Sequence, residues 1–91
     1  MTLSAASIVG QVDNQVSVDL NGETAILNLA SMSYFGLDEV GRFIWEAISE
    51  PKAVDQICAA VCKHFDVSEE QCRIDVLSFL LELDKAGLIE I

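Results

Sequence analysis

Residues 33–48, SYFGLDEVGRFIWEAI, change their hydrophobic period from that of a strand to that of a helix within a few positions. The segment 33–37 is short and rich in aromatic and branched side chains, which is typical of a strand. Asp38 is a suitable N-cap for the helix that follows. Four apolar residues then recur at helical spacing: Val40, Phe43, Ile44 and Ala47. The sequence therefore predicts a strand joined to a helix almost without a loop. A rigid corner of this kind beside a free strand edge is a place where an extended peptide can dock.

Two further strands are predicted before this corner. Residues 15–20 alternate, with Val16, Val18 and Leu20 on one face, and Asn21-Gly22 is the favoured dipeptide of a type I′ hairpin. The next strand is expected over about 23–29, where Ile26 interrupts the alternation, so both faces of this strand are expected to be partly covered. The result is a three-stranded antiparallel meander. Residues 1–10 show no clear pattern, and a flexible conformation is open for residues 1–14.

The second half of the chain is predicted to be helical. Apolar residues at helical spacing indicate one helix over about 53–65, with Pro51 near its start. Ser68 is the expected N-cap of the last helix, and Gln71 completes the pattern of a capping box. This helix runs to about residue 86, where Gly87 fits the position that ends a helix. The apolar tail 88–91 is expected to return to the sheet or to the core.

Length and charge limit the class of protein. Ninety-one residues are enough for one domain with a core of its own, so residues 1–91 are taken as a single domain. Fifteen acidic residues against five basic ones give a formal charge of −10. Such a surface repels phosphate backbones and anionic lipids, which argues against nucleic acid and membranes as partners. No apolar stretch is long enough for a membrane span, and no basic segment precedes the first residues, so a cytoplasmic location is expected.

No constellation of residues points to catalysis, a cofactor or a metal. Three cysteines cannot all pair within the chain and fit reduced, buried thiols: Cys58, Cys62 and Cys72. With His64 they invite a zinc interpretation, but their spacing is not that of a structural zinc site. His64 is the only histidine, no nucleophile is placed beside it, and the five glycines are dispersed. The chain is therefore predicted not to be an enzyme.

The last helix is apolar over more than one stripe. Its expected core face consists of Cys72, Val76, Phe79, Leu80 and Leu83. An adjoining stripe contains Ile74, Leu77 and Leu81. Two interpretations stay open, because the sheet can cover both stripes, or a partner can cover the second one. The second interpretation predicts a groove between this stripe and the strand at 33–37.

Several segments together resemble the PqqD-like proteins, which are also called RiPP precursor peptide recognition elements. The matching residues are 22–28 (GETAILN), 34–41 (YFGLDEVG), 44–46 (IWE), Asp75-Val76, Leu80, Leu83 and Gly87-Leu88. The chain is most similar to the small stand-alone members that serve lasso-peptide biosynthesis. Asp38 stands where those members usually have asparagine, and it preserves helix capping.

The resemblance implies an α+β, winged-helix-like fold with a three-stranded antiparallel sheet followed by three helices. It also implies a non-catalytic adaptor that binds the leader segment of a precursor peptide and presents it to a leader peptidase. In the family the leader adds as a strand to the third strand and lies against the last helix. The leader-binding residues expected here are Ser33, Tyr34, Phe35, Gly36, Leu37, Arg73, Ile74, Leu77, Leu81 and Lys85.

Within this set the residues are expected to act differently. The main chain of Ser33, Phe35 and Leu37 is expected to pair with the leader, and the side chains of Phe35 and Leu37 to lie mostly in the core. The last helix is expected to supply a pocket wall through Ile74, Leu77 and Leu81. Arg73 and Lys85 are expected to pair with leader carboxylates. Trp45 is interpreted as a core anchor.

Two rival functions and two oligomeric states stay open. The original PqqD role would carry the precursor of a quinone cofactor to a radical enzyme. A winged-helix DNA binder would share the fold, but the last helix has five acidic residues against only Arg73 and Lys85. A free edge at 33–37 is compatible with a monomer or with a dimer through that edge.

Overall fold

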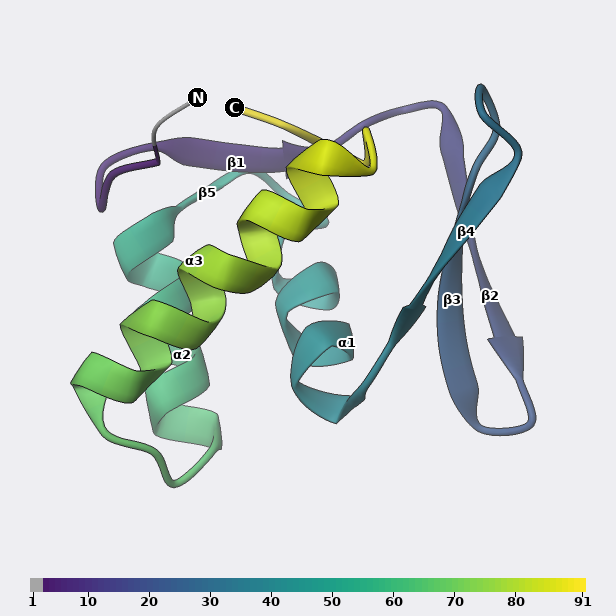
Figure 1. Cartoon of the computed structure of the whole chain (residues 1–91). Helices are drawn as coiled ribbons and strands as arrows, with labels where there is room; N and C mark the ends of the chain where they lie inside the picture. The colour runs from purple at the N-terminus through teal and green to yellow at the C-terminus, as the bar shows by residue number, and fades with distance from the viewer. Residues whose placement is uncertain (1–2) are drawn as a thin grey trace.

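The computed structural model describes residues 3–91 and has an α+β fold with three helices and two small sheets (Figure 1). The helices occupy one side of the molecule, and a long hairpin sheet stands beside them. The elements in chain order are β1 (Ile8–Gln11), β2 (Gln15–Leu20), β3 (Glu23–Asn28), β4 (Ser33–Leu37), α1 (Glu39–Ala47), β5 (Lys52–Ala53), α2 (Val54–His64), α3 (Glu69–Lys85) and β6 (Ile89–Glu90). The predicted fold class is confirmed.

The hairpin sheet has the strand order β2-β3-β4, as the predicted antiparallel meander requires. Leu20 pairs with Glu23 across the first turn, and Asn28 pairs with Ser33 across the second. Asn21 and Gly22 have φ angles of 55° and 86°. Positive φ at both central residues is the requirement of a type I′ turn, so the predicted hairpin is confirmed.

A second sheet, with the order β5-β1-β6, was not predicted. Its middle strand β1 pairs with β5 through Ile8 and Ala53, and with β6 through Gln11 and Ile89. The C-terminal tail was expected to return to the sheet or to the core. It returns to a sheet, but to β5-β1-β6 and not to the predicted meander. Val9 is fully buried and Ile89 nearly so, and both belong to the core. The segment for which a flexible conformation was open thus contributes a core strand.

The helices begin and end close to the predicted positions. The Asp38 carboxylate accepts a hydrogen bond of 2.7 Å from the Gly41 N–H, which confirms the predicted N-cap of α1. The Ser68 hydroxyl accepts one of 3.2 Å from Gln71 N–H at the start of α3. The Gln71 side chain donates to Asp75 and not back to Ser68, so only half of the expected capping box forms. None of the helices within residues 3–91 is long and apolar enough to cross a membrane.

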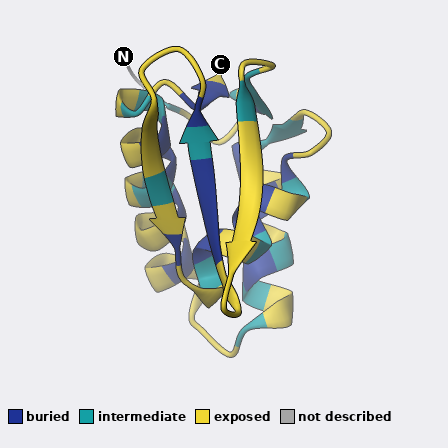
Figure 2. Cartoon of the chain, turned by 90° about the vertical axis from the view of Figure 1, so that its right-hand side faces the viewer, coloured by how far each residue is buried: buried dark blue, intermediate teal, exposed yellow. Residues whose placement is uncertain are grey.

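The two faces of the hairpin sheet differ. Ile26 is fully buried and Leu37 almost so, and both point toward the helices and join the core. The face turned away from the helices is seen directly in Figure 2, where β2 and β4 are mostly exposed and the central β3 is mostly buried. Three apolar residues of β2 lie on this outer face and are exposed: Val16, Val18 and Leu20.

Candidate functional site

Strand β4 has a neighbour on one side only. It pairs with β3 over its whole length, and no other strand within residues 3–91 lies on its second edge. The two chain ends that could have covered this edge are used elsewhere, because β6 pairs with β1 through Gly10 and Glu90. An uncovered strand edge carries main-chain N–H and C=O groups that can pair with another extended segment.

The register determines which main-chain groups of β4 face this free edge. Leu29 directly follows β3, and its N–H donates to the Asn14 carbonyl. The odd-numbered residues of β3 and its extension therefore turn their main-chain N–H and C=O groups toward β2. Alternation then turns those of Ile26 and its even-numbered neighbours toward β4. The residues opposite them, including Phe35, must face back toward β3.

The groups that point outward from β4 are therefore those of Tyr34 and Gly36. This corrects the expectation that Ser33, Phe35 and Leu37 supply the main-chain partners of a docked peptide. The free edge offers two N–H donors and two C=O acceptors, spaced two residues apart.

The side chains of β4 alternate as predicted. Leu37 is 9% exposed and belongs to the core, and Phe35 packs against the core from a partly buried position. Tyr34 is 78% exposed and lies on the outer face opposite Leu27. An added Cβ at Gly36 would meet nothing within 4 Å, so the space beside this residue is open.

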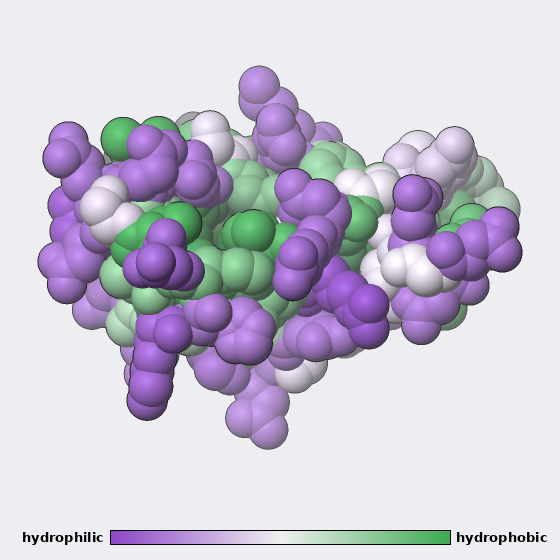
Figure 3. Space-filling model, turned by 90° about the horizontal axis from the view of Figure 1, so that it is seen from below, coloured by the Kyte–Doolittle hydropathy of each residue, from purple (hydrophilic) through white to green (hydrophobic). Residues whose placement is uncertain are grey.

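Helix α3 approaches β4 through Phe79. The rings of Phe35 and Phe79 meet edge to face with centroids 6.1 Å apart. The Phe79 ring also covers the first turn of α1, since a Cβ on Gly41 would come within 3.0 Å of it. Apolar side chains gather in the middle of the lower face of the molecule, with polar side chains around them (Figure 3). Phe35 and Phe79 join β4 to α3 beside the start of α1, and we call the surface along this contact the β4–α3 cleft, with the two rings as its apolar floor.

Asn28 holds the two walls of the cleft together at one end. Its side-chain amide donates to the Ala86 carbonyl at 2.9 Å, at the end of α3. Its side-chain oxygen accepts from the Ala30 and Ser31 N–H groups in the turn before β4. Gly87, with φ of +71°, lies so close that a Cβ there would be 3.1 Å from the Asn28 amide nitrogen. Asn28 is nearly buried and fixes where β4 begins relative to α3.

The structure does not bring all the predicted residues of α3 to this cleft. Arg73 and Leu77 line a pocket of about 480 Å³ between α3, α2 and the segment before β1. Leu77 is two positions from Phe79, about 200° around the helix, so these two side chains point to opposite sides. Ile74, Leu81 and Lys85 are exposed and lie on the stripe between the two sides. Their role in peptide binding stays a prediction.

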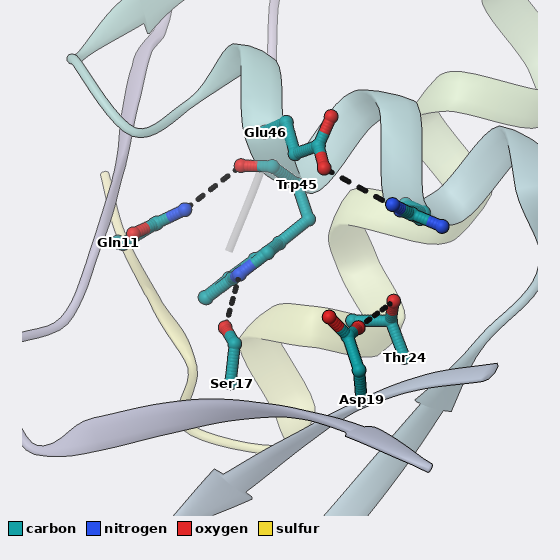
Figure 4. A network of polar contacts seen from close by, with 7 residues as sticks. Gln11, Ser17, Asp19, Thr24, Trp45 and Glu46 are labelled. Atoms are coloured by element: carbon teal, nitrogen blue, oxygen red, sulfur yellow. Dashed lines mark hydrogen bonds and ion pairs between the residues drawn. The ribbon is translucent and has the colours of Figure 1, made fainter. Parts of the chain in front are cut away.

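Trp45 is a core residue, as predicted, and it joins both sheets to α1 (Figure 4). It is only 4% exposed. Its indole N–H donates to the Ser17 hydroxyl of β2 at 3.0 Å, and its carbonyl accepts from the Gln11 side chain of β1 at 2.8 Å. On the exposed side of α1 near Trp45, Arg42 and Glu46 form an ion pair of 3.4 Å.

Cys58, Cys72 and His64 make contacts within the helical part of the molecule. The Cys72 thiol donates to the Cys58 carbonyl at 3.1 Å. Burial is the main cause that raises the pKa of the Cys58 and Cys72 thiols above 9.0, which keeps both in the less reactive protonated form. His64 stacks on Phe43 with ring centroids 4.4 Å apart. No group of three metal-binding side chains occurs within residues 3–91.

Two residues of the cleft were missed by sequence reasoning. Phe79 was assigned to the core face of the last helix, and no sequence pattern shows which side of a helix meets a strand edge. Asn28 is part of the family pattern, but its structural role was not predicted. The signal that could have pointed to it is an asparagine directly before a short turn, where its side chain can accept from turn N–H groups.

The chain matches the family model described as coenzyme PQQ synthesis protein D (PqqD) over residues 23–89. The chain belongs to the PqqD family. The matched residues include β3, β4 and all three helices, and therefore the whole β4–α3 cleft. Among curated proteins, none matches the chain.

Two solved structures are similar to this PqqD family member. One is TbiB1 in complex with the TbiA(beta) leader peptide, with 33% sequence identity and a TM-score of 0.81, covering 89% of this chain and 94% of that one. The other is a lasso peptide synthetase B1 complexed with the leader peptide, with 11% identity and a TM-score of 0.80. It covers 91% of this chain and 98% of that one, and at this identity it shows the fold alone.

Proposed function

We propose that this protein is a non-catalytic adaptor of lasso-peptide biosynthesis, which binds the leader segment of a precursor peptide and presents it to a leader peptidase. The observation that carries the proposal is the free edge of β4 beside the apolar floor of the β4–α3 cleft. Membership of the PqqD family and similarity to a leader-peptide complex support it.

Binding would occur by strand addition. The leader would pair with the outward N–H and C=O groups of Tyr34 and Gly36 and so extend the sheet beyond β4. These main-chain bonds depend little on the leader sequence, so they supply affinity more than selectivity.

Selectivity would come from the helix side of the cleft. Leader side chains that turn inward would meet Phe35 and Phe79, and the longer ones would reach Ile74 and Leu81 on the exposed stripe of α3. Asp75 and Glu82 are exposed and share the helix face of Phe79. Their carboxylates favour a leader that is neutral or basic where it passes α3, and Lys85 is the cation nearest along the stripe for a leader carboxylate.

The alternative is the original PqqD role, in which the protein carries the precursor peptide of the quinone cofactor. This role would use the same cleft. The 33% identity to TbiB1, solved in complex with the TbiA(beta) leader peptide, supports leader binding, and the Tyr34-Phe35-Gly36-Leu37 run resembles the lasso branch. The two roles differ in the peptide that binds, so both precursor peptides belong in one binding experiment.

The test is a calorimetric titration of a lasso leader peptide into the wild type, Gly36→Pro and Gly36→Ala. Proline removes one outward N–H of β4 without removing a bond to β3, and strand edges tolerate it there. We expect Gly36→Pro to weaken binding by more than about tenfold, or about 1.4 kcal/mol. Gly36→Ala keeps the N–H and has room for its methyl group, so its affinity should stay within about threefold. Equal affinity of all three proteins would refute strand addition at β4.

A further inference from the structure

Helices α2 and α3 border a pocket on the side of α3 that faces away from β4. Its volume of about 480 Å³ is within the range of small-molecule sites. Much of its lining recurs every four positions along each helix, so each helix turns one face toward it: Val54, Cys58 and Cys62 from α2, and Glu69, Arg73 and Leu77 from α3. We call this space the α2–α3 pocket. None of these residues belongs to the β4–α3 cleft.

The segment before β1 forms a third wall of the α2–α3 pocket. Its Ala5 carbonyl accepts a hydrogen bond of 3.0 Å from the Asp55 N–H, and its Ser7 carbonyl accepts one of 2.9 Å from the Val54 N–H. Both donors lie in the first turn of α2 (Figure 1). Leu3 of the same segment lines the pocket and packs against the core. The third wall is therefore held in place by main-chain bonds, and the pocket is formed before any ligand binds.

The lining of the α2–α3 pocket is largely apolar. Val54 is buried, and Leu3, Cys58, Cys62 and Leu77 are half-buried against the core. Burial raises the pKa of the Cys58 thiol, so this side chain stays protonated and acts as a small apolar group. From Val54 to Cys62 the α2 wall is about 12 Å long, which is about the length of an extended ten-carbon chain.

Two cations without ion-pair partners border this apolar lining. Arg73 stands in the middle of the α3 wall, and its charge partly offsets the effect of burial on the pKa of Cys58, so it lies near that thiol. Within residues 3–91 the only ion pair is that of Arg42 and Glu46, so neither Arg73 nor Lys63 is paired. A guanidinium group can bind a carboxylate through two parallel hydrogen bonds. The pocket therefore suits a ligand with an apolar chain and one negative charge.

Two carboxylates of the chain also line the α2–α3 pocket. Asp55 lies in the first turn of α2, and Glu69 lies in the first turn of α3. The dipole of each helix favours negative charge at this position, so each carboxylate is stabilised by its own helix. Neither is within ion-pair distance of Arg73. The groups left to bind a ligand are the apolar lining and the two cations.

We propose that the α2–α3 pocket binds a small amphipathic carboxylate. Arg73 and Lys63 hold the carboxylate group, and the apolar chain runs along α2 toward Val54. This second site does not depend on the proposed function. It lies on the opposite side of α3 from the β4–α3 cleft, since Leu77 lines the pocket while Phe79 meets Phe35 of β4. The leader and the carboxylate ligand can therefore bind at the same time.

The test compares decanoate with decanol and decylamine, which have the same chain but carry no charge and a positive charge. Each is titrated into the wild type below its micelle concentration, and amide NMR shifts report the affinity and the site. We expect decanoate to bind at least about tenfold more tightly than decanol and to shift the amides of Cys58, Cys62 and Leu77. Equal affinities of decanoate and decanol would overturn the proposal. So would a preference for decylamine, because the two carboxylates would then bind a cation.

Charge variants test the assignment of Arg73. Arg73→Gln should reduce the preference for decanoate over decanol at least about fivefold. The matched control is Arg42→Gln, which removes the same charge from the exposed side of α1 and should change the preference by less than about twofold. Glu69→Gln removes a negative charge one turn from Arg73 and should strengthen decanoate binding. Equal effects of the two arginine variants would overturn the proposal, because the preference would then reflect net charge alone.

A space-filling variant and a competition experiment test where the ligand lies. Ala59 is exposed and lines the pocket, so Ala59→Phe should fill the space and abolish binding of decanoate while the protein stays folded. Saturating leader peptide should change the decanoate affinity by less than about twofold. Displacement of decanoate by the leader would assign the pocket to the leader and overturn the proposal. Failure of the leader to bind at all would refute only the proposed function.

Discussion

The two three-stranded sheets of this small protein differ in how much of them is exposed. The β5-β1-β6 sheet joins the two ends of the chain and contributes Val9 and Ile89 to the core. The β2-β3-β4 sheet leaves its β2 and β4 strands mostly exposed. Both sheets therefore contribute to the core, and the second sheet also offers exposed surface for partners. The first of the following predictions tests this difference between the sheets, and the others test how the helices are joined to them and to one another.

The largest effect is expected from the same substitution made in each sheet. Val9 is fully buried in β1, so Val9→Asp places an unpaired carboxylate in the core. We expect a loss of more than about 3 kcal/mol in the free energy of unfolding. Val18 is 38% exposed on β2, and Val18→Asp should cost less than about 1 kcal/mol. Urea denaturation followed by circular dichroism measures both. Equal losses of unfolding free energy would contradict the difference in burial between β1 and β2.

Asn28→Ala probes the link between the exposed sheet and the end of α3. The variant loses the bonds to the Ala86 carbonyl and to the turn before β4, and it leaves the turn N–H groups without their partner. We expect a loss of about 2 kcal/mol in unfolding free energy and weaker leader binding, because β4 is no longer fixed relative to α3. Asn28→Asp keeps the acceptor for the turn but not the donor for α3. Its unfolding free energy and leader affinity should therefore lie between those of the wild type and Asn28→Ala. Full leader affinity in Asn28→Ala would remove Asn28 from the architecture of the cleft.

The two sides of α3 can be separated by Phe79→Leu and Arg73→Ala. Phe79 contacts Phe35 at the floor of the cleft, whereas Arg73 lines the pocket on the α2 side. We expect Phe79→Leu to weaken leader binding roughly fivefold, or about 1 kcal/mol, and Arg73→Ala to change it by less than about threefold. Calorimetric titration measures both affinities. The reverse order would place the leader on the α2 side of α3, where Arg73 and Leu77 lie.

The smallest effect concerns pH. Because burial raises the pKa of Cys58 and Cys72, the unfolded thiols lose their protons first, near 9.0, while the folded thiols keep theirs. The unfolded state then binds fewer protons, so stability is unaffected by these groups below pH 9.0 and falls as the pH rises above it. The slope cannot exceed about 1.4 kcal/mol per thiol and pH unit. Cys58→Ala/Cys72→Ala should show a flatter decline, and an identical slope would contradict the burial of the thiols.

The parts of the fold that are determined by residues close together in the sequence could be predicted from it. The Asn21-Gly22 turn, the alternation of β2 and the caps at Asp38 and Ser68 are local signals, and all of them appear in the structure. The β5-β1-β6 sheet could not be predicted, because β5 and β6 have two residues each and find their partner far away in the chain. Strands of this length leave no periodic pattern.

The candidate site was predictable only in part for a related reason. The sequence identifies β4 as a strand beside a helix, but the direction of its main-chain groups follows from the register of the whole sheet. Similarly, α3 is apolar on more than one side, and only tertiary packing shows that Phe79 meets β4 while Leu77 faces α2. The alternation of β2 was correctly recognised, but it did not reveal that the apolar side faces water.

Trp45 offers a built-in optical probe of these events. It is the only indole of the chain, and it is hydrogen-bonded to both sheets. Its emission should be blue in the native protein and shift to the red when the sheets separate from α1. Because Trp45 is 4% exposed and is not one of the residues of the β4–α3 cleft, a leader can bind there without quenching it directly. A spectral change on binding would then report that the hairpin sheet has moved against the helices.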